Sequence, residues 1–544
     1  MSERDILLEM KGLRIEARVG ETWSEIVHGV DLTLHKGEVM GLIGESGAGK
    51  STIGLAAMGF ARDGCRLSGG EIRFDGIDLM RASARQKRRL WGSRIAYVAQ
   101  SAAAAFNPAH RLIDQFCEAP LEHGIAGRRE SEAYGKELFA RLRLPEPESI
   151  GFRYPHQVSG GQLQRAMTAM AMSCRPDLIV FDEPTTALDV TTQIEVLAAI
   201  RDVVEQFGTA ALYITHDLAV VAQMADSIMV LRHGDMVELG ETRQLLASPK
   251  ETYTQDLLRV RSFRKPQAAE ASAEVPLVEL QQVSAAYGPV KVLDKVSFAL
   301  HRQRTVAVVG ESGSGKSTAA RVITGLLPPT EGRILAKGEP LPADYRSRTK
   351  DQLRQIQMIY QMPDTALNPR QTIRQVIGRP AAFYLGLSGK RLDERIRELI
   401  HLIELDPDDY IDRLPTELSG GQKQRICIAR ALAAEPELII CDEVTSALDQ
   451  LVAEEILKLL QRLQDELGLA YMFITHDIGT VRAIADEVVV MLQGQVVEHG
   501  PKDEMFTPPH HDYTEKLLAS VPEMDPDWLT NLLAERPKLV EKQE

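Results

Sequence analysis

Residues 44–52 read GESGAGKST and directly follow the apolar run VMGLI at 39–43. Residues 310–318 read GESGSGKST and directly follow TVAVV at 305–309. Each apolar run predicts a buried strand, and each glycine-rich stretch has the phosphate-loop pattern GxxxxGK[ST]. The glycines let the backbone wrap a phosphate chain with its amide groups pointing inward, and the helix that follows offers its N-terminus to the anion. Two α/β nucleotide-binding domains are therefore expected, each with a mainly parallel sheet.

The residues of these loops are expected to bind ATP, with the lysine reaching the terminal phosphates and the serine after it binding Mg²⁺. The first loop consists of Gly44, Glu45, Ser46, Gly47, Ala48, Gly49, Lys50, Ser51 and Thr52. The second consists of Gly310, Glu311, Ser312, Gly313, Ser314, Gly315, Lys316, Ser317 and Thr318.

Three further blocks repeat in the same order, each 260 residues apart. SGGQLQR at 159–165 returns as SGGQKQR at 419–425, DEPTTALD at 182–189 as DEVTSALD at 442–449, and ITHD at 214–217 as ITHD at 474–477. The sequence thus contains two copies of the same ordered set of motifs, which predicts domains at 5–264 and 277–522. The Ala/Glu/Pro-rich stretch 265–276 is expected to be a linker, and 523–544 a polar tail. Segments near 110–158 and 370–418 are expected to form helical subdomains.

Paired acids close a buried strand in each half. Asp182 and Asp442 are expected to hold hydrated Mg²⁺ opposite the phosphate loop. Glu183 and Glu443 follow them and are expected to polarise the water that attacks the γ-phosphate. Such a pair alone would be a surface feature of a strand end, but the upstream phosphate loop in both copies favours catalysis.

Other strand ends carry further candidates. His216 and His476 are expected to contact the γ-phosphate or to orient the water, and their recurrence favours this role over a structural one. Gln100 and Gln361 are expected to contact Mg²⁺ or the water, although an ordinary polar strand end explains them equally well.

Small residues open a helix in each SGGQ block. These residues are Ser159, Gly160, Gly161 and Gln162 in the first half and Ser419, Gly420, Gly421 and Gln422 in the second. Such an end suits a phosphate, and it also suits an ordinary N-cap serine. The residues alone leave open which phosphate it meets.

The composition narrows the class of protein. The chain has 544 residues and a formal net charge of −14, which argues against a nucleic-acid binder. Its five cysteines form no CxxC pair, as is typical of a reducing cytosol. The first residues show no signal-peptide pattern, and no apolar run of about 18 residues occurs. Other chains are therefore expected to supply any membrane part.

Phosphate loop, glutamine, SGGQ, DE and histidine, in this order, resemble the ABC transporter ATPase family over both halves. The resemblance implies ATP and Mg²⁺ as ligands, and a core sheet, an antiparallel β-subdomain and a helical subdomain in each domain. It further implies that the two domains pair, so that each SGGQ closes on the ATP held by the other domain's loop. Asp189 and Asp449 match the motif that links the two sites. Tyr287 fits the residue that stacks on adenine, whereas Ala17 holds that place in the first half and Trp23 is its nearest aromatic substitute.

Two details are similar to the dipeptide/oligopeptide/nickel import branch. Asn-Pro follows each glutamine at 107–108 and 368–369, and the halves end in the similar tails SPKETYTQDLL at 248–258 and PPHHDYTEKLL at 508–518. This implies a peripheral subunit on the cytoplasmic face of the bacterial inner membrane, working with two permease subunits and a solute-binding protein to import peptides. No cysteine follows Cys441, so no iron–sulfur cluster is expected. His510 and His511 are expected to be solvent-exposed.

Several alternatives stay open. The same branch includes opine, glutathione and nickel uptake systems, because substrate choice depends on other subunits. A soluble twin-ABC translation factor usually has a long basic linker, and a DNA-repair ABC ATPase has zinc-binding CxxC insertions. Neither feature occurs here. A non-hydrolysing regulatory protein would not need the intact lysine and glutamate pairs.

Overall fold

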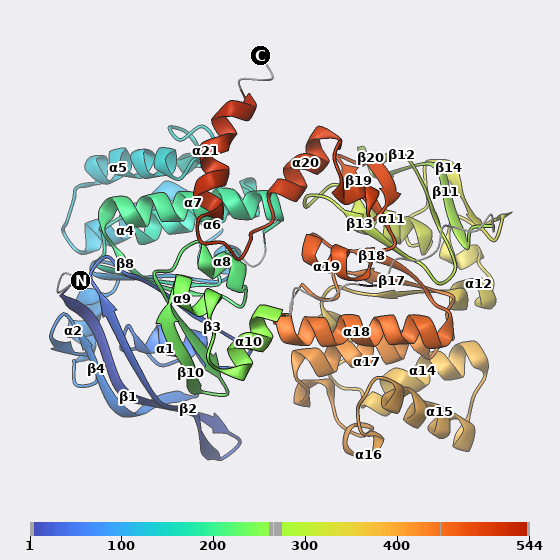
Figure 1. The fold of residues 1–544 in the computed structure, drawn as a ribbon, viewed down its shortest axis with the longest axis horizontal. Coiled ribbons are helices and arrows are strands. Elements are labelled where there is room, and N and C mark those ends of the chain that lie inside the picture. The colour runs from blue at the N-terminus through green and yellow to red at the C-terminus, as the bar shows by residue number, and fades with distance from the viewer. Residues whose placement is uncertain (1–4, 186–187, 260–264, 266–274, 447, 541–544) are drawn as a thin grey trace. The chain divides into compact units, whose positions relative to one another are not determined.

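The computed structural model describes residues 5–185, 188–259, 265, 275–446 and 448–540 (Figure 1). The chain forms two compact units: unit 1 comprises Met1–Arg259 together with Pro522–Glu544, and unit 2 comprises Val260–Val521. The stretch expected at 523–544 as a separate tail thus belongs to unit 1. Most of the expected linker, 266–274, lies outside the described residues.

Unit 1 contains two sheets, and its elements follow the periodicity of the sequence. Its strands are β1 Ile6–Val19, β2 Thr22–His35, β3 Val39–Gly44, β4 Cys65–Phe74, β5 Ile77–Asp78, β6 Ile95–Val98, β7 Leu178–Asp182, β8 Ala210–Ile214, β9 Ser227–Arg232 and β10 Asp235–Glu241. Its α-helices are α1 Lys50–Ala56, α2 Ala84–Leu90, α3 Ala102–Ala105, α4 Leu112–Glu122, α5 Arg128–Arg141, α6 Gly160–Ala171, α7 Val190–Phe207, α8 Leu218–Ala222, α9 Thr242–Ala247, α10 Thr252–Arg259 and α21 Trp528–Val540.

The core sheet of unit 1 has the strand order β10-β9-β3-β8-β7-β6. Its strands run parallel except for β10, which pairs antiparallel with β9. The antiparallel sheet β2-β1-β4-β5 forms the second layer. Strands β3, β7 and β8 are buried along their whole length, as expected for apolar runs covered on both faces. Because parallel strands end at one edge, the residues that follow β3, β6, β7 and β8 converge there.

Unit 2 repeats this plan. Its strands are β11 Val278–Tyr287, β12 Val290–Leu300, β13 Thr305–Val309, β14 Glu331–Ala336, β15 Glu339–Pro340, β16 Ile356–Ile359, β17 Leu438–Asp442, β18 Ala470–Ile474, β19 Glu487–Leu492 and β20 Gln495–Pro501. Its α-helices are α11 Lys316–Ile323, α12 Lys350–Gln355, α13 Pro363–Ala366, α14 Ile373–Leu385, α15 Gly389–Leu402, α16 Pro407–Tyr410, α17 Gly420–Leu432, α18 Gln450–Leu467, α19 Ile478–Ile484 and α20 Asp512–Ala519. The sheets have the orders β16-β17-β18-β13-β19-β20 and β12-β11-β14-β15. The predicted fold class is confirmed.

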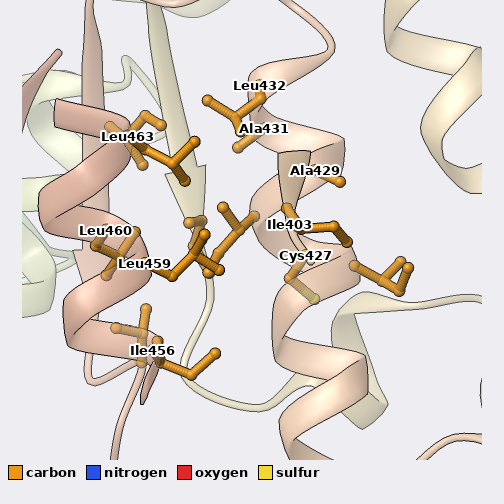
Figure 2. Close-up of a cluster of buried hydrophobic side chains, with 14 of the residues drawn as sticks. Ile403, Cys427, Ala429, Ala431, Leu432, Ile456, Leu459, Leu460 and Leu463 are labelled. Atoms are coloured by element: carbon orange, nitrogen blue, oxygen red, sulfur yellow. The ribbon is translucent and has the colours of Figure 1, made fainter. Parts of the chain in front are cut away.

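The helices of unit 2 pack on the core sheet through a continuous apolar cluster. Figure 2 shows side chains of α17 and α18 turned toward each other across this interface, among them Cys427, Ala431, Leu432, Leu459, Leu460 and Leu463. The leucines recur at helical spacing along one face of α18, which begins at the N-cap Asp449 and ends at Gly468 with φ 67°. This packing fixes the positions from which the SGGQ block and the acidic strand end project.

Candidate functional site

The phosphate loops connect β3 to α1 and β13 to α11. Their glycines are required by the backbone: Gly44 and Gly310 both have φ 148°, and a Cβ atom there would lie 2.0 Å from the Leu231 carbonyl oxygen and 2.2 Å from that of Met491. Only glycine fits, because the neighbouring backbone leaves no room for a side chain. The two loops are therefore built alike, as the repeat predicts.

Each loop lysine lies folded against its own loop. Lys50 Nζ donates to the carbonyl oxygens of Gly44 and Glu45 at 2.7 and 2.8 Å. Lys316 Nζ makes the corresponding two bonds, also at 2.7 and 2.8 Å. Both side chains are 6% exposed. The ammonium groups are thus held at the mouth of the loop, where a terminal phosphate would meet them.

The loop serine and the strand-end aspartate lie together in each unit. Ser51 Oγ donates to Asp182 Oδ1 at 2.7 Å, and Ser317 Oγ donates to Asp442 Oδ1 at 3.0 Å. Burial raises the pKa of Asp442, against the hydrogen bond from Ser317. These hard oxygen donors are the kind that Mg²⁺ prefers.

The predicted glutamate, histidine and glutamine of unit 1 are brought into one cluster. Gln100 Nε2 donates to Glu183 Oε2 at 2.9 Å, and His216 Nδ1 lies 3.4 Å from Glu183 Oε1. Glu183 adopts φ 50°, in the left-handed region that non-glycine residues seldom occupy. Its amide donates to the Ile214 carbonyl at 2.9 Å, which fixes this backbone between two strand ends. Such enforced geometry is typical of functional positions.

Unit 2 reproduces the cluster. Gln361 Nε2 donates to Glu443 Oε2 at 2.6 Å, His476 Nδ1 lies 3.3 Å from Glu443 Oε1, and Glu443 has φ 51°. Burial is the largest influence on His476 and opposes its charge, but the hydrogen bond to Glu443, together with the attraction of the Glu443 and Asp477 carboxylates, raises the pKa of the imidazole. Burial likewise opposes charge on Glu443, yet the His476 contact lowers the pKa of its carboxyl. The pair therefore favours carboxylate beside imidazolium.

The SGGQ serines cap helices within their own units. Ser159 and Ser419 are the N-caps of α6 and α17, and each hydroxyl accepts the amide of the glutamine three residues later at 3.3 Å. Each glutamine side chain accepts from the serine amide in return. Asp189 and Asp449 cap α7 and α18 in a similar way. The serines thus form the N-caps that the sequence allowed, and they leave Gly160 and Gly420 exposed at the helix ends, whereas Gly161 is buried against Thr192.

The position predicted to stack on adenine differs between the units. Tyr287 ends β11, is 42% exposed, and accepts a hydrogen bond from Arg321 at 3.0 Å. Ala17 pairs with Ser24, and Tyr287 pairs with Val290, which lies 266 residues after Ser24 (24 to 290). Ala17 therefore occupies the register of Tyr287, although it cannot stack. Trp23 is 40% exposed and lies under the Arg66 guanidinium, 4.3 Å from its ring centroid.

Two tyrosines that the sequence analysis did not select contact the phosphate loops. Tyr253, on α10, accepts the Glu45 amide at 3.2 Å, and Tyr513, on α20, accepts the Glu311 amide at 2.8 Å. They are 7% and 8% exposed. Both belong to the repeated YTxxLL tail, a pattern that indicates the import branch but does not by itself indicate contact with the loops.

The remaining expectations concern metals and membranes. His510 differs from its expected exposure: its side chain is 5% exposed and Nδ1 lies 3.7 Å from Glu498 Oε1 on β20, where the His511 amide also donates to Glu498 Oε2 at 3.1 Å. Within the described ranges, no group of three or more His, Cys, Asp or Glu is arranged to hold a metal ion. In the same ranges, no helix has the length and apolar character needed to cross a membrane.

Comparison with known proteins agrees with this geometry. The ABC transporter family matches residues 27–186 and 293–446, and the family "Oligopeptide/dipeptide transporter, C-terminal region" matches residues 497–544. Glutathione import ATP-binding protein GsiA of Salmonella typhimurium (strain LT2) is 37% identical over 568 residues, covering 97% of this chain and 91% of that protein. GsiA of Escherichia coli O157:H7 is 36% identical over 566 residues, covering 96% and 90%.

Among solved structures, cbiO1 from Clostridium perfringens, described as part of the ABC transporter complex cbiONQ, is 30% identical, with a TM-score of 0.39 and coverage of 43% of this chain and 91% of that one. The family match spans more than half of the residues and falls in both units. The chain belongs to the ABC transporter family, and it is an ATPase subunit with two ATP-binding cassettes.

Proposed function

We propose that this chain supplies the ATP hydrolysis that drives import of small peptides, glutathione included, across a bacterial inner membrane. The relatives that align over almost the whole chain are named as glutathione import proteins, and residues 497–544 match the oligopeptide/dipeptide transporter region. The observation that carries the proposal is the repetition of one Gln–Glu–His cluster beside a complete phosphate loop in both units. Two hydrolytic sites rather than one regulatory site follow from it.

Within each site the roles divide by position. The lysine stabilises the charge of the terminal phosphates, since its ammonium group is held at the loop mouth. Glu183 and Glu443 accept a proton from the attacking water, or position it, at the edge of the sheet. His216 and His476 orient that carboxylate and contact the γ-phosphate. Gln100 and Gln361 donate hydrogen bonds to the same carboxylates. Through these contacts they communicate nucleotide binding at the site to the helices that follow them in the chain.

Mg²⁺ fits beside the phosphate loop of each unit. The residues that would hold it are Ser51, Gln100 and Asp182 in unit 1, and Ser317, Gln361 and Asp442 in unit 2. When bound, the ion neutralises charge on the β- and γ-phosphates. The hydroxyl and carboxylate oxygens already lie together in both units, which supports this assignment.

The two cassettes are proposed to share their sites. Loop 44–52 would hold an ATP that is completed by Ser419–Gln422, and loop 310–318 one completed by Ser159–Gln162. In favour of this assignment, each SGGQ helix begins with small, exposed residues that a phosphate could approach. The partners would be two permease subunits and a solute-binding protein, with this chain on the cytoplasmic face of the membrane.

Transport of a labelled solute tests the proposal. A strain that lacks this chain is complemented with the wild type or with the double variant Glu183→Gln/Glu443→Gln, and uptake of radiolabelled glutathione and of a labelled dipeptide is measured. Loss of uptake by at least tenfold in the double variant, at equal protein levels, is expected. Equal uptake in both strains would refute the catalytic roles.

The same complementation separates the substrate classes. Restored uptake of glutathione or of a peptide supports the proposed import function. If a nickel salt or an opine is taken up and neither glutathione nor the peptide is, the ATPase assignment stands and the substrate is corrected. Recovery of two multi-span proteins with the tagged chain after mild solubilisation would identify the permease partners.

A further inference from the structure

The C-terminal segment 522–530 packs against unit 1, although it follows unit 2 in the chain. Unit 2 is thus inserted between Arg259 and Pro522, and the polypeptide passes between the units twice. We call residues 522–530 the C-terminal clasp. Figure 1 shows α21, which begins within the clasp, crossing α7 of unit 1, and a hydrogen bond from Arg201 Nη1 to Thr530 Oγ1 at 3.1 Å joins these helices.

The centre of the clasp is one buried side chain of unit 1. Gln223, directly after α8, is 4% exposed. Its Nε2 donates to the carbonyl oxygens of Glu523 and Asp525 at 2.8 and 2.9 Å, and its Oε1 accepts the Leu529 amide at 3.0 Å. One carboxamide therefore forms hydrogen bonds with three backbone groups of the clasp. These contacts depend on the backbone conformation of the segment and not on the identity of its side chains.

Apolar and charged contacts complete the docking. The Leu529 side chain is fully buried, at 0% exposure. Arg243 donates to both carboxylate oxygens of Asp527, at 2.9 and 2.6 Å. The bidentate geometry fixes orientation, while its exposure to solvent limits its energetic contribution.

The first crossing between the units is anchored at the matching place on unit 2. Position 483 lies 260 residues after position 223 and belongs to α19, the counterpart of α8. There the Ala483 carbonyl accepts the amide of Lys265 at 2.8 Å. Lys265 Nζ lies 2.7 Å from both Asp486 Oδ2 and Gln464 Oε1, and this side chain is 9% exposed. Each segment that passes between the units is thus held by buried polar contacts on the unit that it enters: Lys265 on unit 2 and the clasp on unit 1.

We infer that the clasp is a second tie between the two cassettes, so that they stay joined when the first crossing is severed and no nucleotide is bound. A tether raises the effective concentration of the partners it connects. Two anchored crossings restrict separation more than a single tether does, because a single tether only limits the distance between the parts that it joins. The inference concerns assembly, and it does not rest on the proposed transport function.

The test cuts the first crossing between the units and leaves the clasp. A protease site replaces residues 260–264 in the full chain, so that Lys265 and its contacts with unit 2 stay on one fragment. The purified protein is cleaved without nucleotide, and the fragments are followed by size-exclusion chromatography at low micromolar concentration. With the clasp intact, the fragments are expected to co-elute. In a chain truncated after Val521, they are expected to separate.

Point variants keep the test decisive if truncation impairs folding. Gln223→Met keeps the size of the side chain and removes its three clasp hydrogen bonds, so at least a tenfold weaker association of the cleaved fragments is expected. Arg243→Asp and Asp527→Arg should each weaken association, and the double reversal should restore it. Separation of the cut wild-type fragments, or equal co-elution with and without the clasp, would overturn the inference.

Discussion

Replacing Tyr513 by phenylalanine should weaken ATP binding at the second phosphate loop. The change keeps the ring that fills the space beside α20 and removes the hydroxyl that accepts the Glu311 amide at 2.8 Å. A buried amide that loses its acceptor costs about 1–2 kcal/mol. The Glu311 amide shares its peptide plane with the Gly310 carbonyl, which accepts Lys316 Nζ at 2.7 Å, so loosening this plane disturbs the resting position of the lysine as well.

That cost corresponds to roughly a 5- to 30-fold loss of affinity for ATP at this loop. The assay is equilibrium titration with a fluorescent ATP analogue, in a background where Lys50→Ala weakens binding to the first loop. The matched variant Tyr253→Phe, tested with Lys316→Ala, should give a similar loss at the first loop. Tyr384→Phe, a tyrosine far along the chain on α14, is the control and should change nothing.

Steady-state kinetics add a second criterion. The loss should raise KM and leave kcat nearly unchanged, because the hydroxyl holds the loop in the ground state and in the transition state alike. Affinity within about twofold of the wild type, or a fall in kcat at constant KM, would refute the view that this tyrosine positions the loop.

Three further outcomes follow from the structure. Tyr287→Ala should weaken nucleotide binding at the second loop by about 1–3 kcal/mol if the ring stacks on adenine, while Ala17→Tyr should strengthen binding at the first; equal affinities in parallel titrations would contradict this. A native thiol titration should find Cys65 reactive and the other four cysteines protected, because burial raises the pKa of Cys427 to about 11 and raises that of Cys117, Cys174 and Cys441 as well; rapid reaction of more than one thiol would disagree. His476→Gln should lower the free energy of unfolding, measured with urea, more at pH 6 than at pH 9. The raised pKa of His476 gives stability that is complete below about 6.5 and disappears as pH rises through the pKa of the folded state. The same loss at both pH values would exclude the ion pair.

The sequence was sufficient for the parts of the site that lie on regular elements. Glycine at 44 and 310, acids at the ends of β7 and β17, and histidines after β8 and β18 all follow from apolar runs that end at one edge of a parallel sheet. The alternation of strand and helix fixes the parallel sheet, and the parallel sheet brings these residues together. Periodicity and motif spacing therefore predicted which of these residues lie together.

Contacts between distant segments could not be derived in the same way. Tyr253 reaches Glu45 across 208 residues, and Gln223 reaches Leu529 across 306. Neither pair has a pattern that links its members, because a hydrogen bond to a backbone group places no demand on the type of residue that supplies that group. The left-handed φ of Glu183 is also invisible in the sequence, since it comes from the fixed path between β7 and β8.

The two sites share a backbone and differ in the side chains around it. Tyr97 pairs with Val180 in β6–β7, and Met358 pairs with Ile440 in β16–β17, so the tyrosine and the methionine hold the same register. Tyr97 donates its hydroxyl to Asp182 Oδ2 at 2.5 Å, while Ser51 occupies Oδ1.

A thioether cannot donate, so among the described residues the Asp442 carboxylate has one hydroxyl donor, from Ser317, where Asp182 has two. The first unit thus has the better-held aspartate and Ala17 in the register of Tyr287, whereas the second unit has the aromatic residue and the less restrained aspartate. Intact motifs in both halves consequently do not make the side chains around the two phosphate loops equivalent.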